Sequence, residues 1–150
     1  MDQLAVQTHP IDQPALQQWL QADASAGAVV CFTGLVRNHN DGSSVTTLTL
    51  EHYPGMTERA LAAIVADARQ RWPLARVAVV HRVGPMVPSD VIVMVGVASC
   101  HRGAAFEAAT CIMDRLKTET PFWKKDTNGT ESRWVDAHAS DQEAVQRWHD

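Results

Sequence analysis

The sequence predicts an α+β fold in a single domain that spans residues 1–150. Strand-like and helix-like segments are mixed along the chain without the strict alternation of a parallel α/β fold. A polar loop containing Asp41-Gly42 joins the first two long strand-like segments, which is typical of a hairpin. We therefore expect a mixed or antiparallel sheet with helices packed on it.

The first half of the chain predicts two helices and two strands. Leu16, Trp19 and Leu20 at helical spacing predict a helix over 13–22, and β-branched or alternating residues predict strands over 28–36 and 45–52. Thr57 is the expected N-cap of the next helix, with Glu58 in its first turn. Pro73 ends that helix, whose apolar stripe comprises Leu61, Ile64, Val65, Ala68 and Trp72.

The second half predicts two strands and two further helices. Residues 76–83 alternate, with Val77, Val79, His81 and Val83 on one face, and residues 84–90 read as a turn. Residues 91–98 are apolar on both faces, which indicates a central strand. Helical spacing predicts a helix over 102–118 that Pro121 closes, then a polar stretch over 126–132 and a last helix over 140–148.

Composition excludes several classes of protein. The 150 residues are 45% hydrophobic and 20% charged, and a chain of this length can bury about 70% of its unfolded surface without a metal or disulfide. The net charge of −4 argues against coating nucleic acid or an anionic membrane. Cys31, Cys100 and Cys111 form no Cys-x-x-Cys pair, and the histidines form no His-x-x-x-His pair, so we expect no metal site.

The chain shows no targeting or membrane segment. Residues 1–4 contain neither a basic region nor the start of an apolar signal core. The longest apolar run, 91–98, is far shorter than the roughly 20 residues of a membrane span. We expect a cytoplasmic protein.

The lysines are unevenly distributed. Only three of the thirteen basic residues are lysines, and Lys117, Lys124 and Lys125 lie within nine residues. Lys117 falls in the last turn of a predicted helix, where a cation is favourable in any case. Adjacent residues of a strand face opposite ways, so at most one of Lys124 and Lys125 joins Lys117 in a pocket. Crowding Lys117 against Lys124 and Arg102 requires an anion or a neutral lysine, which is typical of an enzyme.

A second polar cluster lies at residues 99–103, where a buried strand meets a helix. Free amide hydrogens at a helix start suit an anion, and His101 and Arg102 add side-chain donors. The alternative is that Arg102 pairs with a surface carboxylate and Ser99 is a cap. Cys100 is expected to be a buried thiol beside an exposed imidazole. Arg37 lies at a strand end facing a cleft or, equally, in a solvated loop.

The sequence resembles the MoaE family, the large, catalytic subunits of molybdopterin synthase. The resemblance runs in order from about residue 27 to residue 134, with a weaker tail to residue 148. Five motifs carry it: residues 32–40 (FTGLVRNHN), 50–56 (LEHYPGM), 81–84 (HRVG), 99–102 (SCHR) and 116–125 (LKTETPFWKK).

The resemblance implies an enzyme of molybdenum cofactor synthesis with an α+β, hammerhead-like architecture. In that family a small ubiquitin-like subunit carries sulfur as a thiocarboxylate on its C-terminal Gly-Gly. Two sulfur transfers convert cyclic pyranopterin monophosphate into the dithiolene of molybdopterin. The resemblance also implies a homodimer within a heterotetramer, and chemistry that requires neither a metal nor a cofactor.

The resemblance also assigns site residues. Lys117 and Lys124 match the two active-site lysines: we expect Lys117 at the thiocarboxylate and Lys124 in proton transfer as the phosphate ring opens. Arg37, His101 and Arg102 match positions that hold the phosphate. The expected pocket lining is the backbone at Leu35 and Val36 and a turn at Lys125 and Asp126. His138 departs from the family, where an arginine that reaches the neighbouring subunit's site is expected, so a phosphate contact there is in question.

Two other classes of function remain open. A non-catalytic adaptor for a ubiquitin-like tail would use the same cleft and would tolerate arginine at Lys117 and Lys124. A cysteine-dependent acyl transferase would depend on Cys100.

Overall fold

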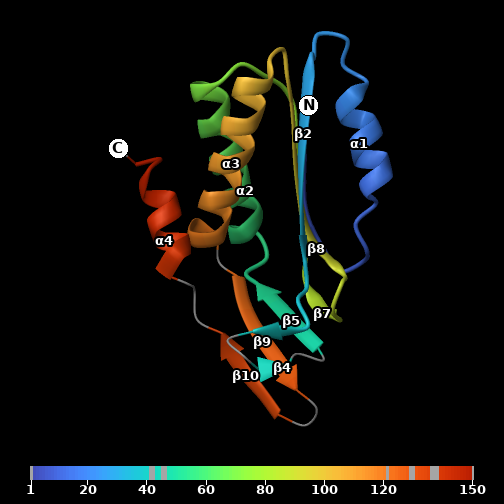
Figure 1. The fold of residues 1–150 in the computed structure, drawn as a ribbon, viewed down its shortest axis with the longest axis vertical. Coiled ribbons are helices and arrows are strands. Elements are labelled where there is room, and N and C mark those ends of the chain that lie inside the picture. The colour runs from blue at the N-terminus through green and yellow to red at the C-terminus, as the bar shows by residue number, and fades with distance from the viewer. Residues whose placement is uncertain are drawn as a thin grey trace.

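The computed structural model describes residues 2–40, 43–44, 47–120, 122–128, 131–135 and 139–149. Figure 1 shows the arrangement of the elements. In chain order they are β1 (Gln3–Gln7), α1 (Gln13–Gln21), β2 (Ala28–Leu35), β3 (His39–Asn40), β4 (Ser43–Ser44), β5 (Thr47–His52), α2 (Met56–Arg71), β6 (Leu74–Arg82), β7 (Gly84–Met86), β8 (Val91–Ser99), α3 (Arg102–Glu119), β9 (Phe122–Asn128), β10 (Glu131–Val135) and α4 (Ala139–Gln146).

The first sheet has the strand order β1-β6-β8-β2. β1 runs parallel to β6, whereas β6 and β2 both run antiparallel to β8. α2 and α3 cover one face of this sheet and α1 covers the other (Figure 1). The predicted α+β class with a mixed sheet is confirmed, and β8 is the central strand that its apolar run indicated.

Both faces of the first sheet are buried because successive residues of its inner strands point to opposite helix layers. Val77 and Val79 pack under α2 and α3, while Ala78 and Val80 pack under α1. α1 approaches closely at Gly96, where an added Cβ would overlap the Leu20 side chain. Burial on both faces explains why residues 77–80 of β6 and 91–98 of β8 are apolar without interruption.

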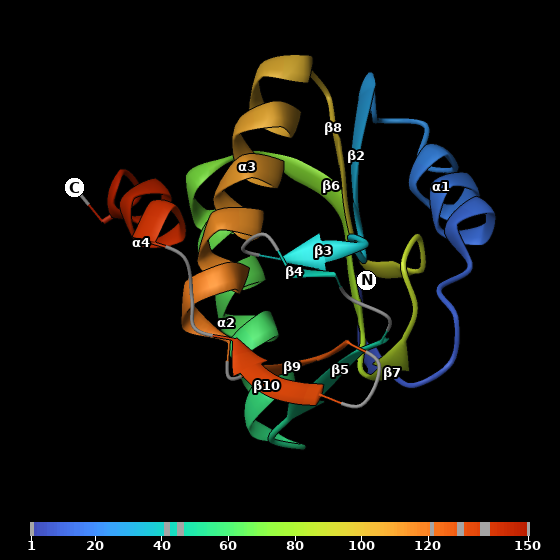
Figure 2. The same ribbon diagram turned by 60° about the horizontal axis from the view of Figure 1, so that its bottom comes forward.

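The second sheet has the order β10-β9-β5-β7 and lies at one end of the first (Figure 2). β5 leads into α2, and α3 leads into β9, so this sheet is joined to the ends of both helices. Its core consists of Val36, Leu48, Leu50, Val83 and Met86. Val6 and Ile92 pack against this core and against the core under α2 and α3, which connects the two.

The expected hairpin between the strands at 28–36 and 45–52 is wrong. β2 pairs with β8, whereas β5 pairs with β7 and β9. The loop between them contains its own short ladder, in which His39 lies opposite Ser44 and Asn40 opposite Ser43. Residues 41–42, which carry the turn signal, lie outside the described residues, and the long strands on either side of this ladder pair in different sheets.

Two local predictions also need correction. The N-cap of α2 is Gly55, at φ +86°, rather than Thr57, and the Glu58 carboxylate accepts the Gly55 N–H at 2.5 Å. The expected turn over 84–90 contains β7, which pairs with β5. The sequence assigned no element to the polar stretch over 126–132, which includes the last residues of β9 and the first residues of β10. It also assigned none to residues 3–7, which form β1.

The C-terminal residues dock on the helical layer. Trp148 Nε1–H donates to the Asp114 carboxylate on α3 at 2.7 Å, and Arg71 of α2 donates to the Trp148 carbonyl at 2.7 Å. The Trp148 ring also meets Trp72 edge-on, with centroids 5.7 Å apart. These contacts hold the C-terminal residues that follow α4 against α2 and α3.

No helix in the described ranges is both long enough and apolar enough to cross a membrane.

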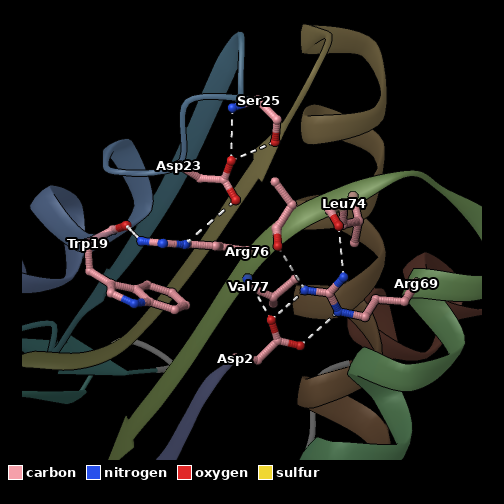
Figure 3. Close-up of polar contacts among 9 residues, drawn as sticks. Asp2, Trp19, Asp23, Ser25, Arg69, Leu74, Arg76 and Val77 are labelled. Carbon is pink, nitrogen blue, oxygen red and sulfur yellow. Dashed lines mark hydrogen bonds and ion pairs between the residues drawn. The ribbon is translucent and has the colours of Figure 1, made fainter.

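Asp2 ties the start of β1 to α2 and β6 (Figure 3). Its carboxylate accepts from Arg69 Nε at 2.8 Å and Nη2 at 2.5 Å, and from the Val77 N–H at 3.1 Å. Arg69 also donates to the carbonyl groups of Leu74 and Ala75 at 2.8 and 3.3 Å. One ion pair therefore joins the start of the chain to α2 and β6, which follow one another 67 to 75 residues later in the sequence.

We predict that Asp2→Asn lowers the free energy of unfolding by about 1–2 kcal/mol at pH 7. The loss is modest because Arg69 is about one-third exposed, so solvent screens the ion pair. Burial works to raise the pKa of Asp2, but the hydrogen bonds and charge of Arg69 with the Val77 N–H outweigh it and lower that pKa. The stabilisation is therefore complete above the unfolded pKa of about 3.9 and is lost as pH falls through the lower folded value. Urea titrations of both proteins from pH 7 to pH 3 measure this, and a difference that stays constant over the range would contradict it.

Candidate active site

The predicted site residues occupy both ends of α3. Arg102 opens this 18-residue helix and Lys117 lies in its last turn. At 1.5 Å rise per residue the two backbone positions are about 22 Å apart along the axis. His101 and Arg102 therefore form one cluster in this chain, and Lys117 belongs to another at the end where the second sheet lies (Figure 1).

Lys117 and Lys124 flank the junction between α3 and β9. The Phe122 N–H donates to the Thr120 carbonyl at 2.9 Å, so the chain turns tightly before entering the strand. β9 then pairs with β5 on one side and β10 on the other, with Lys124 opposite Leu50 and Lys125 opposite Thr49. These β5 positions had not been linked to the lysines by the sequence.

The expected turn at Lys125 and Asp126 is wrong. Both residues lie inside β9, and Asp126 is opposite Leu48 of β5. Pairing on both sides extends the strand through Asn128, past the position of the expected turn. Any contribution of this backbone to a pocket therefore comes from a paired strand.

The two cations near the end of α3 differ in their surroundings. Arg115 donates to Asp67 of α2 and to Glu119, both at 2.5 Å, and the hydrogen bond to Glu119 raises the pKa of its guanidinium. Lys117 is exposed and, within the part of the chain that the structure describes, makes no hydrogen bond or ion pair. Arg115 therefore serves the fold, whereas the Lys117 ammonium is available to a ligand.

The same contrast extends to the other basic side chains. Six arginines form ion pairs with carboxylates: Arg69, Arg71, Arg76, Arg82, Arg115 and Arg147. Among the side chains that the structure describes, Arg59, Arg102 and Lys117 form none. The alternative that Arg102 pairs with a surface carboxylate is therefore wrong for the carboxylates that the structure describes, and two of the three unpaired cations are predicted site residues.

The exit of β2 lies at the Lys117 end of the molecule. β2 runs antiparallel to β8, which leads into α3, so Leu35 and Arg37 lie at the same end as the α3 C-terminus. Val36 is 5% exposed; its N–H donates to Asp90 at 2.9 Å and its carbonyl accepts from Ser89 at 2.8 Å. Leu35 is 54% exposed, and Arg37 is exposed as well.

The start of α3 differs from the expectation at two residues. Ser99 is buried and its hydroxyl donates to the Pro73 carbonyl at 2.6 Å, so it is a structural residue rather than a cap. Cys100 is exposed rather than buried, because β8 ends at Ser99 and Cys100 lies in the turn before the helix. His101 occupies the N-cap with extended backbone and no side-chain capping bond, so its ring is exposed beside Arg102.

The described residues contain no group of three or more histidine, cysteine, aspartate or glutamate side chains that could hold a metal ion. His138, where the resemblance led us to expect an arginine, lies outside the described residues.

Fold and site together define a small α+β protein with a lysine-bearing junction between a helix and a second sheet. Residues 6–119 match the family model of the MoaE protein. The chain is 61% identical over 130 residues, 87% of each chain, to the molybdopterin synthase catalytic subunit of Escherichia coli. The chain belongs to the MoaE family.

Solved structures share the fold. The molybdopterin biosynthesis MoaE protein from Burkholderia ambifaria superposes with a TM-score of 0.85 at 47% identity, covering 100% of this chain and 99% of that one. A protein–protein complex of subunits 1 and 2 of molybdopterin-converting factor from Helicobacter pylori contains a chain with a TM-score of 0.75 at 18% identity, covering 89% and 90%. At that identity the second likeness shows the fold alone.

We predict that Ser99→Ala lowers the free energy of unfolding by about 1 kcal/mol, because it removes a buried hydrogen bond and leaves the Pro73 carbonyl without this donor. Urea unfolding measures the change. Thr110→Ala is the matched control, since Thr110 makes the same kind of bond to a backbone carbonyl but is exposed on α3, and it should cost less than about 0.5 kcal/mol. Equal losses in the two variants would contradict a structural role for Ser99.

Proposed function

We propose that this chain is the catalytic subunit of a molybdopterin synthase. It transfers sulfur from the thiocarboxylated C-terminus of a small ubiquitin-like carrier to cyclic pyranopterin monophosphate, forming the dithiolene of molybdopterin. The 61% sequence identity to the molybdopterin synthase catalytic subunit of Escherichia coli supports the assignment as a catalytic subunit. One observation in this structure supports the proposed chemistry. Lys117 is exposed and forms no ion pair with a described residue, and it lies at the junction between α3 and β9 that leads to Lys124.

The two lysines take different roles in the proposed reaction. Lys117 holds the carrier's thiocarboxylate and the intermediate formed there, because its ammonium is not neutralised by a described carboxylate of the chain. Lys124 transfers a proton as the phosphate ring opens. Each transfer moves one sulfur atom to the pterin and leaves the carrier with a C-terminal carboxylate. Two thiocarboxylated carriers are therefore consumed for each dithiolene. No metal or cofactor of the enzyme enters these steps.

The phosphate contacts require more than one chain. Arg37 lies at the same end as Lys117, but His101 and Arg102 lie about 22 Å away along α3. All of them hold one phosphate only if a second copy brings the start of its α3 to the Lys117 end of the first. The proposed homodimer meets this requirement, and a small subunit with a C-terminal Gly-Gly at each end completes a heterotetramer.

The proposed function is tested by reconstitution. The purified chain is mixed with a thiocarboxylated small subunit and cyclic pyranopterin monophosphate, and the dithiolene is measured. Formation of the dithiolene is the expected result. A folded protein that binds the small subunit and yields no product would refute the enzyme and favour an adaptor.

We predict that Lys117→Arg and Lys124→Arg each reduce the rate of dithiolene formation by about 10²-fold or more, because arginine keeps the charge but does not exchange a proton near neutral pH. Arg59→Lys is the matched control: Arg59 is exposed on α2 and also lacks an ion pair in the described structure, so this exchange should leave the rate unchanged. Normal sulfur incorporation in both lysine variants would exclude catalysis by these amines.

A cysteine-dependent transferase is the competing enzyme, and the exposure of Cys100 makes it worth testing. Burial raises the pKa of Cys111 to about 11 and also raises that of Cys31, so neither supplies a thiolate readily. We predict that Cys100→Ser retains full activity in the reconstituted assay. A loss of more than about tenfold would move the chemistry from the lysines to this thiol.

A further inference from the structure

His81 interrupts an apolar stripe of β6. Val77 and Val79 on the same face are fully buried beneath α2 and α3. His81 comes next on that face and is only 6% exposed, although imidazole is polar. A buried histidine two residues beyond a valine stripe requires an explanation, and the reaction proposed above does not use it.

The imidazole of His81 stacks on the ring of Phe122. The ring centroids are 4.1 Å apart and the planes are inclined by 27°. His81 Nδ1 lies 3.0 Å from the Arg82 carbonyl, which only accepts, so Nδ1 carries the proton in this contact and the ring orientation is set by a hydrogen bond. The hydrogen bond thus fixes the orientation of the imidazole ring, and Phe122 stacks on its face.

The stack joins the two sheets. His81 belongs to β6 of the first sheet, and Phe122 is the first residue of β9 in the second. Phe122 also packs against the core formed by Val36, Leu48, Leu50, Val83 and Met86. The point at which the chain leaves α3 and enters β9 is therefore attached to both sheets.

Phe122 lies between the two lysines of the proposed site. It follows Lys117 by five residues and precedes Lys124 by two, which is about 7 Å along a strand. The Phe122 N–H donates a hydrogen bond to the Thr120 carbonyl at 2.9 Å, so the connection between the end of α3 and the stacked Phe122 is short and constrained. The position of Phe122 consequently sets where β9, and with it Lys124, begins relative to Lys117.

We propose that His81 is a positioning residue: its stack on Phe122 fixes β9 against the first sheet and so sets the placement of Lys124 relative to Lys117. This inference rests on the proposed function for its catalytic consequence. In this proposal His81 acts through the face of its ring, so a phenylalanine ring in its place is expected to preserve the stack on Phe122.

Four variants test the proposal. His81→Ala and Phe122→Leu remove the stack, whereas His81→Phe keeps a ring against Phe122 and loses the bond to the Arg82 carbonyl. Val79→Ala is the matched control, because Val79 lies on the same strand and face, is fully buried, and packs in the core under α2 and α3. It should destabilise the protein without moving β9.

The chain has only three lysines, so ¹⁵N-lysine labelling gives three backbone amide signals, from Lys117, Lys124 and Lys125. β9 has a partner strand on each side, so its amides lie within ladders and exchange slowly. In His81→Ala and Phe122→Leu we expect hydrogen exchange at Lys124 and Lys125 to accelerate about tenfold or more relative to Val79→Ala. In His81→Phe it should stay within about threefold of the wild type.

Kinetics give the second measurement. With the reconstituted synthase, His81→Ala and Phe122→Leu should lose about tenfold or more in kcat while the Kd for the carrier changes less than about threefold, because misplacement of a reacting group affects chemistry more than docking. His81→Phe should retain kcat within about threefold. A His81→Phe variant as impaired as His81→Ala would overturn the proposal, as would unchanged exchange at Lys124 and Lys125 when the stack is removed.

The measurements separate this proposal from the proposed function. If the wild type forms no dithiolene, the proposed function fails, and the exchange of Lys124 and Lys125 still decides whether His81 positions β9. If His81→Ala does not fold, Phe122→Leu and His81→Phe give the answer.

Discussion

Burial of the β6–β8 pair on both faces is the constraint on which the rest of the structure depends. Val77, Val79, Val95 and Val97 are completely buried, and the intervening residues meet α1 on the other side. Each buried valine contributes about 1.5 kcal/mol or more of hydrophobic stabilisation, so leaving either face uncovered is costly. Helices are therefore required on both sides of the sheet, and α3 must run along the sheet to cover, with α2, the face that carries Val77, Val79, Val95 and Val97.

The length of α3 determines where chemistry can occur. A helix that covers the sheet carries its N-terminus to one end of the molecule and its C-terminus to the other, which separates Arg102 from Lys117. Most described arginines are used in ion pairs that secure this framework, as Arg115 is with Asp67 and Glu119. The cations that remain unpaired at the ends of α3 are then the ones that a ligand can use.

The second sheet converts the end of α3 into a defined site. Because β9 begins directly after the helix, the Lys117 ammonium and the backbone at Lys124 are held by the same short connection. The stack of His81 on Phe122 anchors that connection to the first sheet. His81, a residue of the first sheet that is not among the expected site residues, thereby influences the geometry of the proposed site.

The amino-acid pattern alone was enough to predict local features with a strong period: the α2 stripe, the central strand β8 and the limits of α3. These depend on residues near one another in sequence, whose burial follows from spacing. It failed for the hairpin expected between the strands at 28–36 and 45–52, for the turn expected at Lys125 and Asp126, and for the burial of Cys100. Strand partners, the separation of Arg102 from Lys117, and the meeting of His81 with Phe122 were set by tertiary packing, because contacts between distant segments depend on which buried faces must be covered.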